Sequence, residues 1–283
     1  MMRPPPYAGW LERSWYWFYL LFCGLVFFFL IAPILVIIPL SFNAQPYFTF
    51  TREMLAFNPE GYSLRWYEDF LSSSSWLRSI RNSFVIAIAS TLIATVLGTI
   101  AALGLSRSYL PYRNAMMGML ISPMIVPLII SAAGMYFFYS SINLAQTFTG
   151  VILAHAALGT PFVIITVTAT LVGFDYNLVR AAHSLGASPT RTFFKVIMPL
   201  ITPGVVSGAL FAFITSFDEI VVVLFLAGVE QRTIPREMWS GIREDISPTI
   251  LAVATMLVVI SVLLLVTLEL LRRRTERLRG ISG

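Results

Sequence analysis

The chain has 283 residues, of which 57% are hydrophobic and 12% are charged, and its formal net charge is +5. A soluble domain carries about 25% charged residues. This composition therefore excludes a water-soluble protein and predicts a polytopic, all-α membrane protein embedded in lipid. In a membrane protein an excess of basic residues mainly indicates which loops lie in the cytoplasm, so we infer no nucleic-acid partner from it. The single cysteine excludes an internal disulfide or a cysteine-cluster metal site.

Six stretches are long and apolar enough to cross a bilayer as helices, each of which needs about 20 apolar residues. The first begins at Trp17 and is too long for the apolar core of a signal peptide, so we expect it to be retained. Pro123 and Pro127 predict a loosened third helix. We predict one transmembrane domain over residues 1–283, with spans at approximately 17–41, 82–106, 115–139, 150–172, 199–226 and 249–271.

An even number of spans places both termini on one side of the membrane. The N-terminus, the 107–114 turn, the 173–198 loop and the C-terminal tail together carry twelve of the nineteen basic residues. The positive-inside rule therefore predicts cytoplasmic termini. Loops 42–81 and 227–248 then lie outside, as inert connectors or as contacts for an outside partner. We expect an interfacial helix in the first of them.

Small residues recur every four positions in two of the predicted spans, on one helix face each. Small side chains let membrane helices approach closely. Such a row packs helices within the subunit, or it meets a second membrane subunit or lines a path. The rows are Ser90, Ala94, Gly98, Ala102 and Ser106 in the second span, and Gly204, Gly208, Ala212 and Ser216 in the fifth.

Familiar catalytic motifs are missing from the sequence. The only lysine, Lys195, follows Phe194, so the chain has no phosphate-binding loop of the G-x-x-x-x-G-K-[ST] type and does not hydrolyse ATP by that route. It also lacks H-E-x-x-H and G-x-S-x-G. The two histidines, His155 and His183, are far apart, and His155 is either a hydrogen-bonded packing residue or part of a proton relay. We predict no catalytic residue, no metal site and no cofactor on this chain.

The fifth span contains "TSFDEIVVV", in which Asp218 and Glu219 are flanked by apolar runs. Acids inside a span are costly and face a cavity or a partner. One acid could face a path while the other pairs with a neighbouring helix; alternatively the helix breaks here, or both acids are hydrated at the outer interface. Lining a path, they would attract a cationic substrate, with cation–π contacts from aromatic rings. The predicted pathway residues are Phe211, Thr215, Phe217, Asp218 and Glu219.

A polar segment interrupts the apolar pattern at "RAAHSLGASPTRTFFKVIMPL", residues 180–200. Ala181 to Leu185 can form a short helix that Gly186 ends. Ser188 is then the predicted N-cap of a second short helix with Pro189 at its first position. The result is a cytoplasmic helix–turn–helix, which is either a docking surface for a partner or a passive connector.

The same segment resembles the EAA loop of binding-protein-dependent ABC importer permeases. In that pattern E-A-A, three residues, Gly, nine residues and I-x-L-P follow one another, and Ala181, Ala182, Gly186 and Pro199 fall on it in register. Arg180 replaces the glutamate, which removes any ion pair the family makes from that position. "YSLRWYEDF" and "SIRNSFVIA" also resemble the family, and "SFDEIVVVLFLAG" is similar to the second permease subunit of spermidine/putrescine importers.

The resemblance implies a type I ABC importer permease in the bacterial cytoplasmic membrane, importing a small organic cation, with polyamines as the first expectation. The implied partners are a second, non-identical permease subunit, two ATPase subunits that hold ATP and Mg, and an extracytoplasmic substrate-binding protein. The implied ATPase-coupling residues are Arg180, Ala181, Ala182, His183, Leu185, Gly186, Ala187, Ser188, Pro189, Arg191 and Pro199.

Three alternatives stay open. The importer could carry another small amine, an amino acid or a related compound. A stand-alone channel or secondary transporter could use Asp218, Glu219 and His155 as a proton relay. An integral membrane enzyme would need a nucleophile and base that the sequence does not supply.

Overall fold

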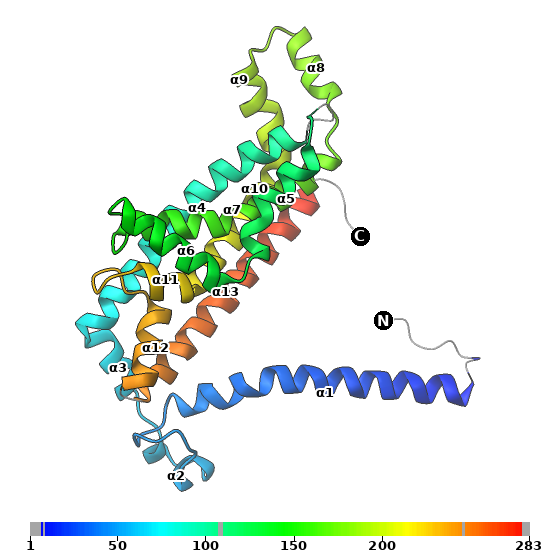
Figure 1. Ribbon diagram of the computed structural model, residues 1–283. Helices are drawn as coiled ribbons and strands as arrows, with labels where there is room; N and C mark the ends of the chain where they lie inside the picture. The colour runs from blue at the N-terminus through cyan, green and yellow to red at the C-terminus, as the bar shows by residue number, and fades with distance from the viewer. Residues whose placement is uncertain (1–6, 8, 107–109, 245–246, 279–283) are drawn as a thin grey trace. The chain divides into compact units, whose positions relative to one another are not determined.

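A computed structural model describes residues 7, 9–106, 110–244 and 247–278, with the side chains of residues 244, 264 and 267–278 left out of the description. These residues form helices and one isolated antiparallel bridge, between Asn43 and Tyr62 (Figure 1). The chain divides into two compact units, 1–72 with 244–266 and 73–243 with 267–283. Of the basic residues used for topology, Arg3, Arg107 and Arg279 lie outside the description, so the membrane orientation stays a prediction.

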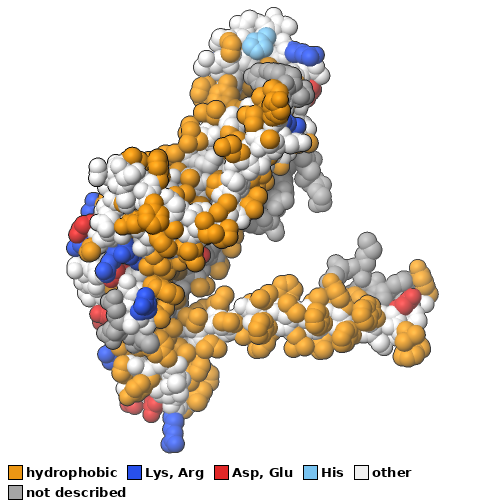
Figure 2. Space-filling view, in the orientation of Figure 1, with side chains coloured by type: hydrophobic (Ala, Val, Ile, Leu, Met, Phe, Trp, Pro, Cys, Tyr) orange, Lys and Arg blue, Asp and Glu red, His pale blue; other side chains and the backbone are white. Residues whose placement is uncertain are grey.

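The first unit begins with α1 (Trp10–Leu40), a 31-residue helix that is apolar on every side beyond Ser14. Figure 2 shows hydrophobic side chains along its length. Loop 42–81 contains a helix, as predicted: α3 (Arg65–Ser72) buries Trp66 and Phe70 and is preceded by α2 (Arg52–Leu55) and the short 3₁₀ helix η1 (Pro59–Gly61). Its place at the membrane interface stays a prediction. The Trp66 indole donates to the Asn43 carbonyl at 2.7 Å, so this loop is a folded lobe.

The second unit is built on three long helices, α4 (Ser74–Leu105), α7 (Phe148–Val172) and α10 (Met198–Asp218), which pack against one another pairwise. The small-residue rows lie at these contacts, and Ala94, Ala102 and Ala212 are buried there. A Cβ atom added to Gly98 would lie 2.6 Å from Cβ of Val163. The interpretation as packing within the subunit is therefore confirmed for both rows.

The third predicted span is broken more sharply than the prolines indicated. It consists of α5 (Arg113–Ile125) and α6 (Leu128–Ser141), which meet at an angle of 98°. Pro127 lies at this break; a proline has no N–H to donate and disfavours α-helical geometry in the residue before it, here Val126. Val126 is extended, with φ −68° and ψ 133°. Counted with this bent pair, up to five spans are long and apolar enough to cross a membrane among the described residues.

The fifth predicted span ends earlier than residue 226. α10 stops at Asp218, Glu219 is extended, and a six-residue helix α11 (Val221–Leu226) follows. The helix therefore breaks at the acidic pair, which was one of the alternatives that the sequence left open. Beyond it lies α12 (Ile234–Glu244). The sixth predicted span falls on α13 (Thr249–Leu278), whose described apolar part covers Thr249–Leu263, so six spans remain a prediction.

Candidate functional site

The 173–198 segment folds as the helix–turn–helix that its sequence indicates. α8 (Asn177–Ser184) ends in a Schellman arrangement, in which the Ala187 N–H donates to the Ala182 carbonyl at 3.0 Å and the Gly186 N–H donates to the His183 carbonyl at 2.9 Å. Gly186 has φ +80°, a left-handed conformation that a residue with a Cβ rarely adopts. The turn therefore depends on this glycine for its backbone shape.

The second helix of the hairpin, α9 (Pro189–Thr192), begins as predicted. The Arg191 N–H donates to Oγ of Ser188 at 3.3 Å, and Pro189 occupies the first helical position. α9 continues through a π-helical turn, η2 (Phe193–Ile197), into α10 without a break. A helix running over Pro189–Asp218 thus joins the polar hairpin directly to the acidic pair.

The hairpin presents a polar surface with one large apolar side chain at its turn. Leu185 is 87% exposed. Arg180, at the glutamate position of the family pattern, is exposed and has no ion pair among the residues that the structure describes. Of the predicted coupling residues, Ala182 and Ala187 are half-buried, and the exposed ones are Arg180, Ala181, His183, Leu185, Gly186, Ser188, Pro189, Arg191 and Pro199.

The two adjacent acids occupy different environments. Asp218, the last residue of α10, is exposed, whereas Glu219 is only 9% exposed. An Oε1 atom of Glu219 accepts the N–H of Val222 at 2.9 Å, so this carboxylate caps the N-terminal end of α11. The alternative in which both acids are hydrated at the outer interface is therefore wrong, because Glu219 is a buried helix cap.

Aromatic rings surround the end of α10. Phe217 lies 5.2 Å from Phe84 and 5.5 Å from Phe213 between ring centroids. Phe211 is half exposed and stacks on Phe162 at 6.1 Å. Thr215 and Phe217 are half-buried. Of the predicted pathway residues, the structure therefore leaves Phe211 and Asp218 accessible on this chain and holds the others within helix contacts.

His155 is a buried, hydrogen-bonded residue, as one interpretation of the sequence expected. Its Nδ1 atom lies 2.8 Å from Oγ of Ser216 on α10, and the Ser90 hydroxyl of α4 lies 2.9 Å from the same oxygen. The rows of small residues left packing within the subunit open as one interpretation for α4 and α10. They did not predict this bond, because Ser90 and Ser216 are 126 positions apart in the sequence.

One functional candidate, Arg236 on α12, was not identified from the sequence. Its Nη1 atom donates to the carbonyl oxygens of Ala227 at 2.6 Å, Gly228 at 3.2 Å and Val223 at 3.3 Å, so it caps the C-terminal end of α11. Partial burial, assisted by repulsion from Arg232, lowers the pKa of Arg236 from its usual value. No local pattern signals the contact, because the arginine lies nine positions beyond Ala227 in the chain.

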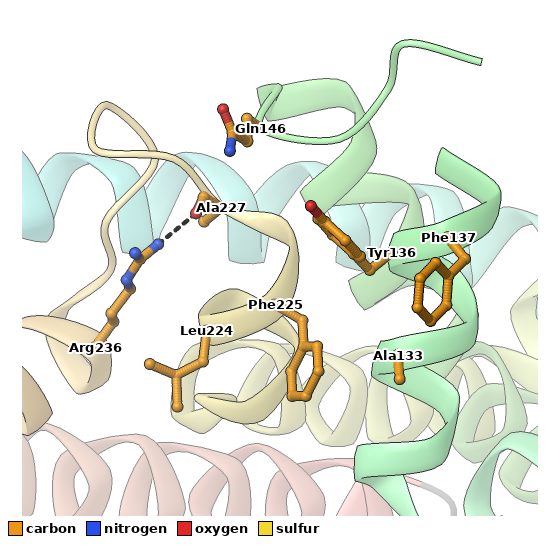
Figure 3. A pocket seen from close by; sticks show the side chains of 8 residues that line it. All are labelled: Ala133, Tyr136, Phe137, Gln146, Leu224, Phe225, Ala227 and Arg236. Atoms are coloured by element: carbon orange, nitrogen blue, oxygen red, sulfur yellow. Dashed lines mark hydrogen bonds between the residues drawn. The ribbon is translucent and has the colours of Figure 1, made fainter. Parts of the chain in front are cut away.

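Arg236 also borders a cavity of about 470 Å³ between α6, α11 and α12. Figure 3 shows the guanidinium at one end of the cavity and the rings of Tyr136, Phe137 and Phe225 towards the other. The remaining lining residues are Ala133, Gln146, Leu224 and Ala227. The arrangement combines backbone carbonyls, one cation and three aromatic rings in a single pocket.

Comparison with known proteins places the chain in a family. Residues 94–277 match the binding-protein-dependent transport system inner membrane component. The chain is 31% identical over 255 residues to the spermidine/putrescine transport system permease protein PotC of Haemophilus influenzae, covering 90% of this chain and 96% of that protein. It is 30% identical over 239 residues to the putrescine transport system permease protein PotI of Escherichia coli, covering 82% of each.

The fold agrees with this assignment. A crystal structure of a bacterial ABC transporter involved in the import of the acidic polysaccharide alginate contains a chain that superposes with a TM-score of 0.73 at 14% identity, covering 93% of this chain and 98% of that one. The chain belongs to the family of binding-protein-dependent transport system inner membrane components, and it is a transmembrane permease subunit of an ABC importer.

Proposed function

We propose that this permease imports a small organic cation, with putrescine- and spermidine-like polyamines as the expected substrates. The observation that carries this proposal is the similarity, over most of the chain, to two permeases of polyamine transport systems. The exposed carboxylate of Asp218 at the broken fifth span supports it, because a carboxylate in an apolar surrounding attracts cations.

The hairpin of α8 and α9 is the proposed contact with an ATPase subunit on the cytoplasmic side. The exposed Leu185 and the small residues around Gly186 suit a groove on a partner. The unbroken helix Pro189–Asp218 then transmits a displacement of the hairpin to the acidic pair. ATP and Mg are held by the two ATPase chains, and this chain contributes no catalytic residue.

In the proposed path Asp218 meets the substrate and Glu219 shapes the site. Because Glu219 is buried and caps α11, it holds the break at which α10 ends and thereby fixes where Asp218 points. Phe211 offers an accessible aromatic face to a cation. Thr215 and Phe217 complete the proposed lining from within the helix contacts.

The remaining architecture follows from the same assignment. We place both termini in the cytoplasm and six spans in one transmembrane domain, with a second, non-identical permease subunit completing the pore. The folded lobe within loop 42–81 and the loop 227–248 face an extracytoplasmic substrate-binding protein. Specificity is then shared between that protein and the path.

The direct test is reconstitution. The tagged chain is co-expressed with its partner permease, ATPase and binding protein, purified, and placed in proteoliposomes with radiolabelled putrescine. Uptake that requires both ATP and the binding protein is the expected result. Purification without an ATPase, together with uptake driven by a proton gradient in ATP-free vesicles, would instead establish the secondary transporter. ATP-dependent uptake of amino acids but not of amines would overturn the substrate class alone.

A further inference from the structure

Three carbonyl oxygens at the C-terminal end of α11 converge on a single nitrogen. The Nη1 atom of Arg236 lies within 3.3 Å of the carbonyl oxygens of Val223, Ala227 and Gly228. A guanidinium Nη atom carries two N–H donors. These can serve the carbonyls of Ala227 and Gly228, because the Val223 carbonyl also accepts the N–H of Ala227 at 3.0 Å. A primary ammonium group carries three donors and a carbonyl oxygen has two lone pairs, so an ammonium group can bind all three oxygens even though that of Val223 already accepts one hydrogen bond.

The carbonyl oxygens of Ala227 and Gly228 are available to a cation, and other groups satisfy the rest of the turn. The Leu226 carbonyl already accepts the N–H of Gln146 at 2.8 Å, and the Gly228 N–H donates to the side chain of Gln231 at 3.0 Å. The C-terminal end of a helix is also its negative end. The carbonyl cluster therefore favours a cation, and a side chain of this chain occupies it.

The rest of the cavity suits the apolar part of an alkylamine. Beside the cluster lies Leu224, and the rings of Tyr136, Phe137 and Phe225 border the cavity beyond it (Figure 3). Methylene groups can lie against these side chains, and a second ammonium group gains cation–π contacts with the rings. A volume of about 470 Å³ falls within the range typical of small-ligand sites.

We propose that this pocket is a binding site for the primary ammonium end of an alkylamine, and that Arg236 occupies it in the substrate-free protein. The proposal rests on the organic-cation import proposed above and adds a second substrate-binding site, besides Asp218, to the proposed path. The ammonium group displaces the guanidinium from the three carbonyl oxygens, while its chain lies along Leu224 and the rings.

The place of the carbonyl cluster in the fold and the competition from Arg236 both suit a site that a substrate occupies briefly while it crosses the membrane. α11 has six residues and is therefore about 9 Å long, with Glu219 capping one end and the carbonyl cluster at the other. A substrate entering from loop 227–248 meets the cluster before it meets Asp218. Because Arg236 competes for the cluster, binding stays weak enough for the substrate to leave, as conduction through successive sites requires.

Substituting the arginine separates this role from a purely structural cap. The assembled transporter in proteoliposomes is assayed for ATP-dependent putrescine uptake over a range of concentrations. R236Q empties the cluster of its cation, and we expect KM to fall about three- to ten-fold, as when a site becomes available that was mostly occupied. R236K supplies a tethered ammonium group that fills the cluster, so its KM should exceed that of R236Q.

A matched control removes the effect of charge alone. Arg232 lies four positions before Arg236 in the sequence. It pairs with Glu237 at 3.5 Å and is not among the residues that line the cavity. We expect R232Q to leave KM within about two-fold of the wild type, because Arg232 is engaged with Glu237 and does not line the cavity. Equal KM values for R236Q and R232Q, or a KM that rises from Arg to Lys to Gln, would show that Arg236 only caps the helix.

A second variant decides the matter if R236Q does not assemble. F225L removes a ring from the cavity but keeps an apolar side chain, and we expect KM to rise about two- to five-fold from the lost cation–π contact. F138L is its control, since Phe138 is exposed on the same unit and is not among the cavity's lining residues. Unchanged KM in F225L, as for a pocket filled by a lipid chain, would overturn the proposal.

A fully N-methylated putrescine separates the carbonyl cluster from the rings. It keeps both positive charges but has no N–H donor, so we expect it to compete with putrescine weakly in the wild type. Competition as strong as that of unlabelled putrescine would contradict the carbonyl site. If the wild type shows no putrescine uptake, the proposed function and this inference both fail; uptake with indistinguishable variants overturns the inference alone.

Discussion

The Nδ1 atom of His155 lies 2.8 Å from Oγ of Ser216, and this contact joins α7 to α10 in the centre of the second unit. The hydroxyl of Ser90 reaches the same oxygen at 2.9 Å and adds α4 to the junction. All three side chains are buried. Because Ser216 stands two residues before Asp218, the junction fixes the end of α10 against its two neighbours.

Replacing Ser216 by alanine removes the shared partner of two buried polar groups. The His155 ring then loses its bond to Ser216, whereas Ser90 keeps its bond to the Ala87 carbonyl at 3.1 Å. A buried polar group left unsatisfied costs about 1–3 kcal/mol. We expect S216A to lower the thermal midpoint of the detergent-purified transporter clearly. S207A, on the same helix at a half-buried position, should leave the midpoint nearly unchanged. Equal midpoints for the two variants would show that the junction contributes little.

The hairpin could be predicted from the sequence because its signals are local. Gly186 with its positive φ, Ser188 as N-cap and Pro189 at the first helical position are all placed within four residues, and each acts on its own neighbours. The distortion of the third span was predictable for the same reason, since proline alters the backbone of adjacent residues. The size of its bend, 98°, depends on packing and was not predicted.

The acidic segment shows where sequence reasoning stopped. Helix periodicity placed Asp218 and Glu219 on different faces, but which face is buried depends on neighbouring helices. The burial of Glu219 and its bond to Val222 decided between the alternatives. The cap from Arg236 is a contact between separate helices, and no residue spacing encodes it. The single domain and the six spans stay predictions.

Substituting Gly186 tests the hairpin turn. An added Cβ would meet no atom within 4 Å, but φ is +80°, so the substitution strains the backbone whatever the free space. Left-handed geometry costs an L-residue about 1–2 kcal/mol. We expect G186A to weaken uptake and G186W to abolish it, because the larger side chain also blocks docking. Co-purification with the ATPase provides the measurement.

Gly173 is the control for that experiment. It lies in the same 173–198 segment, has φ −94°, and an added Cβ would meet nothing within 4 Å. G173A should therefore retain both ATPase binding and uptake. Full-strength ATPase binding by G186W would mean that the hairpin is not the docking surface.

Gly98 tests the close approach of α4 and α7. A Cβ atom there would lie 2.6 Å from Cβ of Val163, which is too close for two carbon atoms, so the helices must separate. Overpacking of this kind costs about 1–3 kcal/mol. We expect G98A to lower the thermal midpoint, whereas G104A, on the same helix with open space around it, should not. A destabilised G104A with an intact G98A would contradict the packing described.

The two acids should respond differently to neutralisation. Asp218 is exposed, so D218N should leave stability within about 0.5 kcal/mol while raising KM for a dicationic amine several-fold, because one attractive charge is lost. Glu219 is buried and caps α11, so E219Q should lower the thermal midpoint by weakening a charge-assisted hydrogen bond. Uptake kinetics and melting are measured on the same preparations. Unchanged kinetics in both variants would remove the acids from the path, and equal destabilisation by both would contradict the division between a substrate contact and a helix cap.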